Sequence, residues 1–301
     1  MGHDDSRARL PPPTLSHGRG AAVTALATRP VAIDELQRAW RAVQAGQFRS
    51  HHAHPDRRRS RLTQAAAITW CPAEPVLPVI GCIGQAGAST MALALATAAG
   101  SARVVECCSA TCSGLGTAAT AELGHTATGW RLGRRDHVEI LRAAGVHLSL
   151  TEVPVPEDPV GAEPIVTVLD VGWDLGQVLA TPGWIEQQVT AAEHLVLVTT
   201  ATLPGLRRLE VAATLLRPQR CLAVVGGAGR RWRPPLIAAG PSIRALADCG
   251  HLIAVATEKA LVRDGITAAP LPPALLRAAT GVLRRSGITP VDASLQKGPI
   301  R

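Results

Sequence analysis

One stretch, residues 76–100 (VLPVIGCIGQAGASTMALALATAAG), restricts the fold more than any other part of the chain. Its apolar start, Val76–Ile83, predicts a buried strand, and its Ala/Leu end, Met91–Ala99, predicts a helix. Between them, Gly84 and Gly87 predict a tight turn. A strand, a glycine turn and a helix in this order present backbone N–H groups and a helix N-terminus to an anion. We therefore expect this turn to be an anion site.

Strands and helices are predicted to alternate along the rest of the chain, which favours an α/β domain with a doubly wound, mostly parallel sheet over residues 69–285. Asp174 is predicted to cap a short helix, and residues 130–145 show no clear period. The further strands are expected at Arg103–Cys108, Ile165–Val171, Leu195–Thr200, Cys221–Val225 and Leu252–Ala256, and the further helices at Ser113–Leu123 (ended by Gly124), Pro204–Leu216, Ile243–Cys249 and Pro273–Arg285.

Residues 1–68 form a polar, arginine-rich arm that is predicted to be disordered, and residues 286–301 form a loose C-terminal tail. Within the arm, Asp34 and Gln37 have the spacing of a capping box in front of a short amphipathic helix at 34–46. This helix either docks on its own domain or binds a protein partner. Both interpretations remain open.

The net charge of +8 is concentrated in the arm, which ends in the basic run Arg57, Arg58, Arg59 and Arg61. Such a run suits nucleic acid, and a solvated tail is the alternative interpretation. The nearby histidines His51, His52 and His54 have no designed ligand geometry, and no metal site is predicted.

Cysteine use and hydropathy favour a cytoplasmic protein. The seven cysteines are an odd number, lie mostly in apolar runs and are expected to be reduced, and no secretory signal is visible. No charged residue lies between Glu74 and Arg103, a span long enough to cross a bilayer. Pro78 and the glycines of the turn interrupt this run, so we expect no stable membrane insertion.

The turn resembles the phosphate-binding loop of the ParA/MinD (SIMIBI-type) branch of P-loop ATPases, whose motif reads KGGxGK[ST][ST]. In this register both motif lysines are replaced, by Ile83 and Ala88, and one glycine is replaced by Gln85. The residues that match the motif are Gly84, Gly87, Ser89 and Thr90. The resemblance covers the layout of about residues 75 to 285 and marks the chain as a degenerate member.

Two later family motifs bear on catalysis. The family follows its second strand with a D-x-D-P-Q-G segment that serves magnesium and catalysis, and here SATCSG (109–114) keeps only Gly114. At the third strand, IVTVLDVG places Asp170 at the Walker B position. LVLVTTATLPGLRRLE resembles the family's next strand, turn and helix, but the adenine-reading asparagine is absent because the chain contains no Asn.

The resemblance implies ATP or ADP with Mg²⁺ as the ligand; without the lysines, it implies that the nucleotide is bound weakly or not at all and is hydrolysed slowly or not at all. No catalytic residue is predicted. Arg230, Arg231 and Arg233 are candidates for a substitute charge. The predicted nucleotide-binding residues are Gly84, Gln85, Ala86, Gly87, Ala88, Ser89, Thr90 and Asp170.

The chain as a whole resembles MinD-like proteins of actinobacterial plasmids and integrative conjugative elements. The segments that carry this resemblance are WCPAEPVLPVIGCIGQAGAST, TAELG…GWRLGRR, and VTTATLPGLRRLE followed by GRRWRPP. This implies an accessory or regulatory protein of mobile-element DNA transfer or maintenance, with DNA and a second copy as partners.

Two enzyme alternatives remain. One is an active ATPase that uses nonstandard residues. The other is an NAD(P)-dependent Rossmann oxidoreductase, in which Glu106 would bind a ribose about twenty residues beyond the turn. Its fingerprint is imperfect, because the spacing here is G-x-x-G-x-x-G, and outside that hypothesis Glu106 is predicted to be a surface acid at a strand end.

Overall fold

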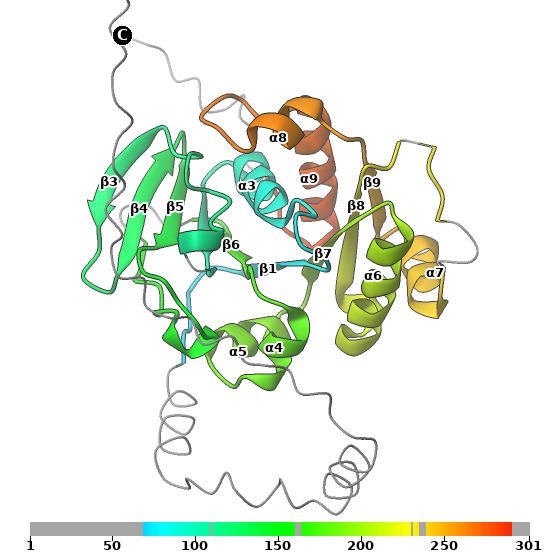
Figure 1. Cartoon of the computed structure of the whole chain (residues 1–301), viewed down its shortest axis with the longest axis horizontal. Coiled ribbons are helices and arrows are strands. Elements are labelled where there is room, and N and C mark those ends of the chain that lie inside the picture. Colours follow the sequence, from blue (N-terminus) through cyan, green and yellow to red (C-terminus); the bar gives the residue numbers. More distant parts are fainter. Residues whose placement is uncertain (1–68, 109, 160–163, 230, 235–238, 291–301) are drawn as a thin grey trace, which may run out of the picture. The chain divides into compact units, whose positions relative to one another are not determined.

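The computed structural model describes residues 69–108, 110–159, 164–229, 231–234 and 239–290. The predicted arm, with its helix at 34–46 and Arg57, Arg58, Arg59 and Arg61, lies outside these ranges, as do residues 291–301 of the predicted tail. The described residues form one sheet in the order β3-β4-β5-β2-β6-β1-β7-β8-β9 (Figure 1). Its strands are β1 Val76–Gly81, β2 Ala102–Glu106, β3 Ala121–His125, β4 Trp130–Arg135, β5 Val138–Ala143, β6 Thr167–Asp170, β7 Leu195–Thr200, β8 Cys221–Gly226 and β9 Leu252–Val255.

Strand β1 lies between β6 and β7 and is parallel to both. The parallel pairing continues through β2 and β5 on one side and through β8 and β9 on the other. The segment after β1 therefore starts where the chain order of the sheet changes direction, which is where open α/β sheets bind ligands. The predicted doubly wound, mostly parallel fold is confirmed.

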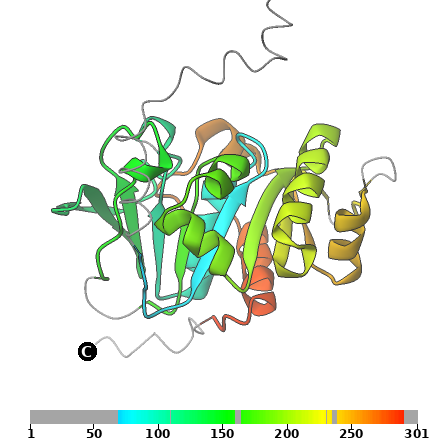
Figure 2. The ribbon, with the colours of Figure 1, turned by 90° about the horizontal axis from the view of Figure 1, so that it is seen from below.

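Helices cover both faces of the sheet. They are α3 Ala88–Ala99, α4 Leu175–Ala180, α5 Trp184–Ala191, α6 Leu203–Leu216, α7 Pro241–Asp248, α8 Lys259–Asp264 and α9 Pro273–Arg285. Figure 2 shows α4 and α5, in green, across the face opposite α9, in red.

Each face has its own apolar core, because successive strand residues point to opposite sides. In β1, Leu77 and Val79 pack with α3 and α9, whereas Ile80 packs in the core that includes α5 and α6. The stretch without charged residues between Glu74 and Arg103 is therefore a buried strand followed by a largely buried helix. No helix among the described residues is long and apolar enough to cross a membrane.

The prediction of a helix at Ser113–Leu123 is wrong. The segment contains turns and the start of β3, which pairs antiparallel with β4 and has a bulge between Glu122 and Gly124. Two of its first N–H groups, on Gly114 and Leu115, donate to a side chain from β2 and not to the carbonyl groups of a helix. Helix propensity is a weak prior, and tertiary contacts override it here.

Residues 130–145, which show no clear period, form the antiparallel hairpin β4–β5, with Asp136 at φ 50° in its turn. The alternation of apolar and polar residues is obscured because arginines are buried in it. Arg135 donates to the carbonyl groups of Ala118, Thr267 and Ala269, and Arg142 pairs with Glu122 at 2.5 Å. These arginines attach the hairpin to the neighbouring loops.

Candidate functional site

The turn after β1 is held in a fixed conformation beside β7. The N–H of Cys82 donates to the Val198 carbonyl oxygen at 2.8 Å, which continues the β1–β7 pairing into the turn. Gln85 has φ 59° and Gly87 has φ 90°, so the backbone turns through two left-handed residues before α3 begins. Left-handed turns of this kind form a concave nest of N–H groups.

The N–H groups of this nest are available to a ligand. Those of Gly84, Gln85, Gly87 and the first three residues of α3 donate to no backbone carbonyl group among the described residues. The first turn of α3 also contains no acidic residue that would neutralise the positive end of the helix dipole. The turn is therefore able to bind an anion with backbone groups alone.

The turn forms one wall of a cleft of about 1100 Å³. The cleft is large enough for a drug-sized or nucleotide-sized ligand. All eight residues predicted to bind nucleotide line it: Gly84, Gln85, Ala86, Gly87, Ala88, Ser89, Thr90 and Asp170. The rest of the lining includes residues at or after the carboxyl ends of β7, β8 and β9 and one residue of α6: Thr200, Thr202, Gly226, Gly227, Thr257, Glu258 and, on α6, Arg208.

Asp170 ends β6 and is completely buried beside the turn. Neither of its carboxylate oxygens has a hydrogen-bond partner of good geometry among the described residues. Burial, with the nearby charge of Glu106 adding to it, raises the pKa of Asp170 to about 7, although the neighbouring Ser89 hydroxyl favours the charged form. An unpartnered buried carboxylate that lines a cleft is a candidate ligand for a cation.

Glu106 is buried, and the prediction of a surface acid is wrong. It accepts hydrogen bonds from the Ser113 hydroxyl at 2.6 Å, from the Gly114 N–H at 2.7 Å and from the Leu115 N–H at 3.0 Å. Burial raises the pKa of Glu106, and these bonds oppose the rise. Both of its oxygens are occupied, so the carboxylate is not available for a ribose, and the oxidoreductase hypothesis is not favoured.

Ser89 lies beside Asp170 and against Gly114, whose N–H donates to Glu106. Glu106 and Asp170 are register partners on adjacent parallel strands. Gly114 packs so closely on Ser89 that a Cβ at position 114 would lie 2.7 Å from the Ser89 Oγ. A hydroxyl and a buried carboxylate are oxygen ligands of the type that Mg²⁺ prefers, so the residues present fit a magnesium ion that also binds phosphate oxygens.

The lysine position of the motif carries no charge, because Ala88 is the first residue of α3 and lines the cleft with a methyl group. Arg231 and Arg233, two of the arginines predicted to compensate, are not among the residues of the lining, and Arg230 lies outside the described residues. Arg208 on α6 does line the cleft. In the sequence, the signal for this residue is the pair Arg207–Arg208 of VTTATLPGLRRLE, which the local motif of the turn does not include.

The seven cysteines are all free, and although most lie in apolar runs of the sequence, three of them are exposed: Cys71, Cys112 and Cys249. Cys82, Cys108 and Cys112 line the cleft. Burial raises the pKa of the Cys82 thiol to about 12, which leaves it protonated and a weak nucleophile. No group of three or more His, Cys, Asp or Glu side chains among the described residues is arranged to hold a metal ion by itself.

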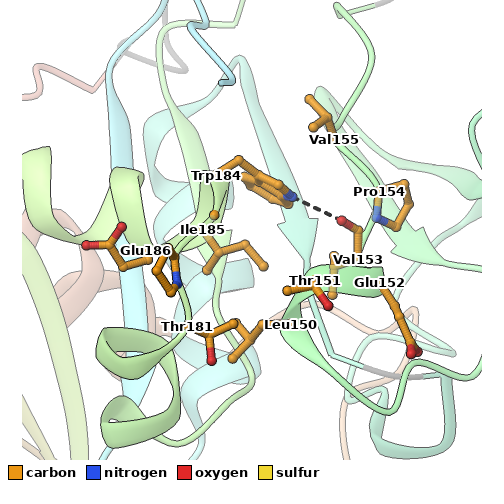
Figure 3. A pocket seen from close by; sticks show the side chains of 12 residues that line it. Leu150, Thr151, Glu152, Val153, Pro154, Val155, Thr181, Trp184, Ile185 and Glu186 are labelled. Carbon is orange, nitrogen blue, oxygen red and sulfur yellow. Dashed lines mark hydrogen bonds between the residues drawn. The ribbon is translucent and has the colours of Figure 1, made fainter. Parts of the chain in front are cut away.

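A second, smaller cavity of about 130 Å³ lies between residues 150–155 and the start of α5 (Figure 3). The indole N–H of Trp184 donates to the Val153 carbonyl oxygen at 3.0 Å across it. Trp184 also packs edge-on against Trp70, with ring centroids 5.4 Å apart. These contacts join the start of the described domain to α5, and we assign the cavity a packing role.

Comparison with known proteins gives similarities of structure. No protein-family model and no curated protein matches the sequence. The septum site-determining protein MinD from Pyrococcus horikoshii, complexed with Mg-ADP, is 16% identical over 71% of this chain and 98% of that chain, with a TM-score of 0.45. A variant of McdA from Cyanothece in complex with ATP is 13% identical over 73% and 99%, with a TM-score of 0.44. A ParA family ATPase from Chlorobium tepidum is 13% identical over 72% and 93%, with a TM-score of 0.38. At these identities and TM-scores the similarities carry no argument about what this chain binds.

Proposed function

We propose that this chain is a degenerate P-loop protein of the ParA/MinD type that binds a nucleotide weakly and hydrolyses it slowly or not at all. One observation carries the proposal: the nest of backbone N–H groups is formed and open to the cleft, while Ala88 occupies the lysine position. The nest supplies neutral donors, which bind phosphate about half as strongly as charged donors do. The cleft can therefore bind a nucleotide without strongly stabilising the charge of a transferring phosphoryl group.

When Mg²⁺ is bound with the nucleotide, the residues that would hold it are Ser89 and Asp170. The ion would supply positive charge at the phosphate oxygens. Glu106 contributes differently, because its hydrogen bonds to Gly114 and Leu115 hold the following loop against Ser89. The sequence SATCSG (109–114) contains no carboxylate that could replace the family's catalytic acids.

The wider role follows from the sequence resemblance. We propose an accessory or regulatory protein of mobile-element DNA transfer or maintenance in the cytoplasm of an actinobacterium. In this proposal, residues 69–285 form the nucleotide-binding domain, the arm (1–68) carries the DNA contacts, and the helix at 34–46 binds a protein partner or its own domain. The remaining parts of the proposal are a C-terminal tail at 286–301 and a homodimer as the oligomeric state.

An active ATPase is the second candidate, and one observation favours it. Asp170 lines the cleft, and its buried carboxylate has no hydrogen-bond partner of good geometry among the described residues, which leaves it available to a magnesium ion. Two measurements separate a degenerate protein, an active ATPase and an oxidoreductase. They are calorimetric titration with ATP, ADP and NAD, with and without Mg²⁺, and a phosphate-release assay. Weak binding of ATP or ADP with negligible release supports a degenerate protein. Mg²⁺-dependent release that is abolished by Asp170→Asn would instead establish the ATPase, and selective NAD binding would establish an oxidoreductase.

The arm gives a separate prediction about DNA. We expect the full-length protein in which Arg57, Arg58, Arg59 and Arg61 are replaced by alanine to bind duplex DNA more weakly. The slope of log K against log salt concentration should become shallower by about 3 to 4, because each arginine–phosphate contact contributes roughly 0.9 to the slope. Fluorescence anisotropy of labelled duplex DNA, titrated at about 50 to 200 mM salt, measures the slope, because affinities of this kind change steeply over that range of salt.

A matched control removes the same charge from the described domain. It replaces four exposed arginines, Arg131, Arg134, Arg277 and Arg284, by alanine in the full-length protein. We expect this control to change the slope less than the arm variant does. An arm variant that binds DNA like the unmodified protein would rule out the arm as the DNA-binding element.

A further inference from the structure

The cleft contains an unusual balance of charge. Its charged lining residues, among those that the structure describes, are Asp170, Asp174, Glu258 and Arg208. The described lining therefore contains three carboxyl side chains and one guanidinium, besides the backbone donors of the nest. Arg208 is the one cationic side chain of this described lining, and it comes from α6, not from the turn.

Strand β7, which leads into α6, is joined directly to the turn. The Cys82 N–H donates to the carbonyl oxygen of Val198, and β7 ends two residues later at Thr200. Thr200 and Thr202 share a hydroxyl–hydroxyl contact of 2.8 Å, and both line the cleft. The end of β7 and the start of α6 therefore form a wall of the cleft that adjoins the nest.

The first turn of α6 is fixed on this wall by close packing. Thr202 caps the helix by accepting from the Gly205 N–H at 3.2 Å, and the Thr199 hydroxyl donates to the Gly205 carbonyl oxygen at 2.8 Å. A Cβ at Gly205 would lie 2.5 Å from the Thr200 Oγ1, so only glycine permits this approach. Arg208 thus projects from a helix turn whose position relative to the nest is set by the strand.

We propose that Arg208 binds the phosphate groups of an anionic nucleotide in this cleft and supplies the positive charge that Ala88 does not. The inference rests on the proposed function and names the side chain and the ligand class, a nucleoside diphosphate or triphosphate. Arg208 is exposed and forms no salt bridge with a described residue, so its guanidinium is available. A guanidinium presents a planar fork of donors that matches two phosphate oxygens at once.

The neighbouring residue provides a matched control. Arg207 has the same side chain and is also exposed, but it does not line the cleft. Arg207→Ala and Arg208→Ala change the net charge of the protein and the composition of α6 equally. A difference between them therefore reports a local contact in the cleft and not the overall electrostatic field of the protein.

The test is calorimetric titration of the full-length protein and both variants with ADP and with ATP, with and without Mg²⁺. We expect Arg208→Ala to raise the Kd on the order of tenfold, as the loss of one charged hydrogen bond does, and Arg207→Ala to change it less than twofold. Circular dichroism confirms that both variants remain folded, as expected for exposed helix positions. If both variants bind equally well, the assignment of Arg208 is wrong while the nucleotide cleft stands. If the unmodified protein binds neither nucleotide, the proposed function fails together with this inference.

Discussion

Ala88→Lys is expected to lower the Kd for ADP and ATP by about 10- to 150-fold, the equivalent of about 1.5–3 kcal/mol for one restored charged hydrogen bond. Ala88 is the first residue of α3, directly after the left-handed Gly87, and it lines the cleft. Apart from its chain neighbours, no described residue lies within 4 Å of the position that a Cβ would take on Gly84, so space is open beside this part of the nest. A lysine at position 88 can therefore place its ammonium group over the turn. Calorimetric titration of the two proteins measures the gain.

Hydrolysis should stay slow in this variant, because the lysine restores binding charge but no catalytic carboxylate is present at 109–114. Gln85→Lys is the control, since it adds the same charge at an exposed position of the turn. We expect a smaller gain from Gln85→Lys because its side chain does not start from the helix N-terminus. The motif register would be wrong if the natural protein bound nucleotide tightly and Ala88→Lys left that affinity unchanged or weakened it.

The parts of the fold that were predicted from sequence are those in which local pattern and tertiary structure agree. The strand at Leu195–Thr200 is β-branched and apolar and became β7, and Pro273–Arg285 became α9 with the predicted ends. Asp174 caps α4 as predicted, through bonds to the N–H groups of Gly176 and Gln177. In each case the local preference of the residues agrees with the structure that they adopt in the folded domain.

The predictions that were wrong or missing share one cause. They concern buried charged side chains whose hydrogen-bond partners cannot be identified from the sequence. Glu106 looked like a surface acid because its three donors are on residues seven to nine positions later, in a loop predicted as helix. The β4–β5 hairpin had no visible period because Arg135 and Arg142 are buried against carbonyl and carboxylate groups. Buried charges require such partners, and a single sequence does not show which residues supply them.

The sequence pattern identified one part of the cleft lining. The turn and Asp170 follow from a local motif, and all eight residues named for it line one cleft. The wall formed by Arg208, Gly226, Gly227 and Glu258 was missed, because its residues come from the ends of strands that become neighbours only in the folded sheet. The carboxyl-end rule for parallel strands indicates this edge of the sheet, but it does not indicate which helix residue turns back into the cleft.

Asp170→Asn is expected to stabilise the protein at pH 8 by on the order of 4 kcal/mol, with little effect near pH 4. The folded protein has an Asp170 pKa of about 7, against an ordinary value of 3.8, because the carboxyl group is buried and close to Glu106. Between these two values the folded state retains a proton that the unfolded state has released. The free energy of unfolding of the natural protein should therefore fall as pH rises from about 4 to about 7 and change little above that.

Asparagine has nearly the same shape as aspartic acid and carries no charge at any pH, so the variant should lose this slope. Urea denaturation followed by circular dichroism at pH 4.5, 6, 7 and 8 gives the free energy of unfolding of both proteins. Asp136→Asn is the control, because Asp136 is exposed in the β4–β5 turn and asparagine tolerates its φ of 50°. Two results would contradict the prediction: the same dependence of unfolding free energy on pH in both proteins, or an Asp170→Asn variant that is less stable than the natural protein at pH 8. Either would show that a partner stabilises Asp170 as a carboxylate in the folded state.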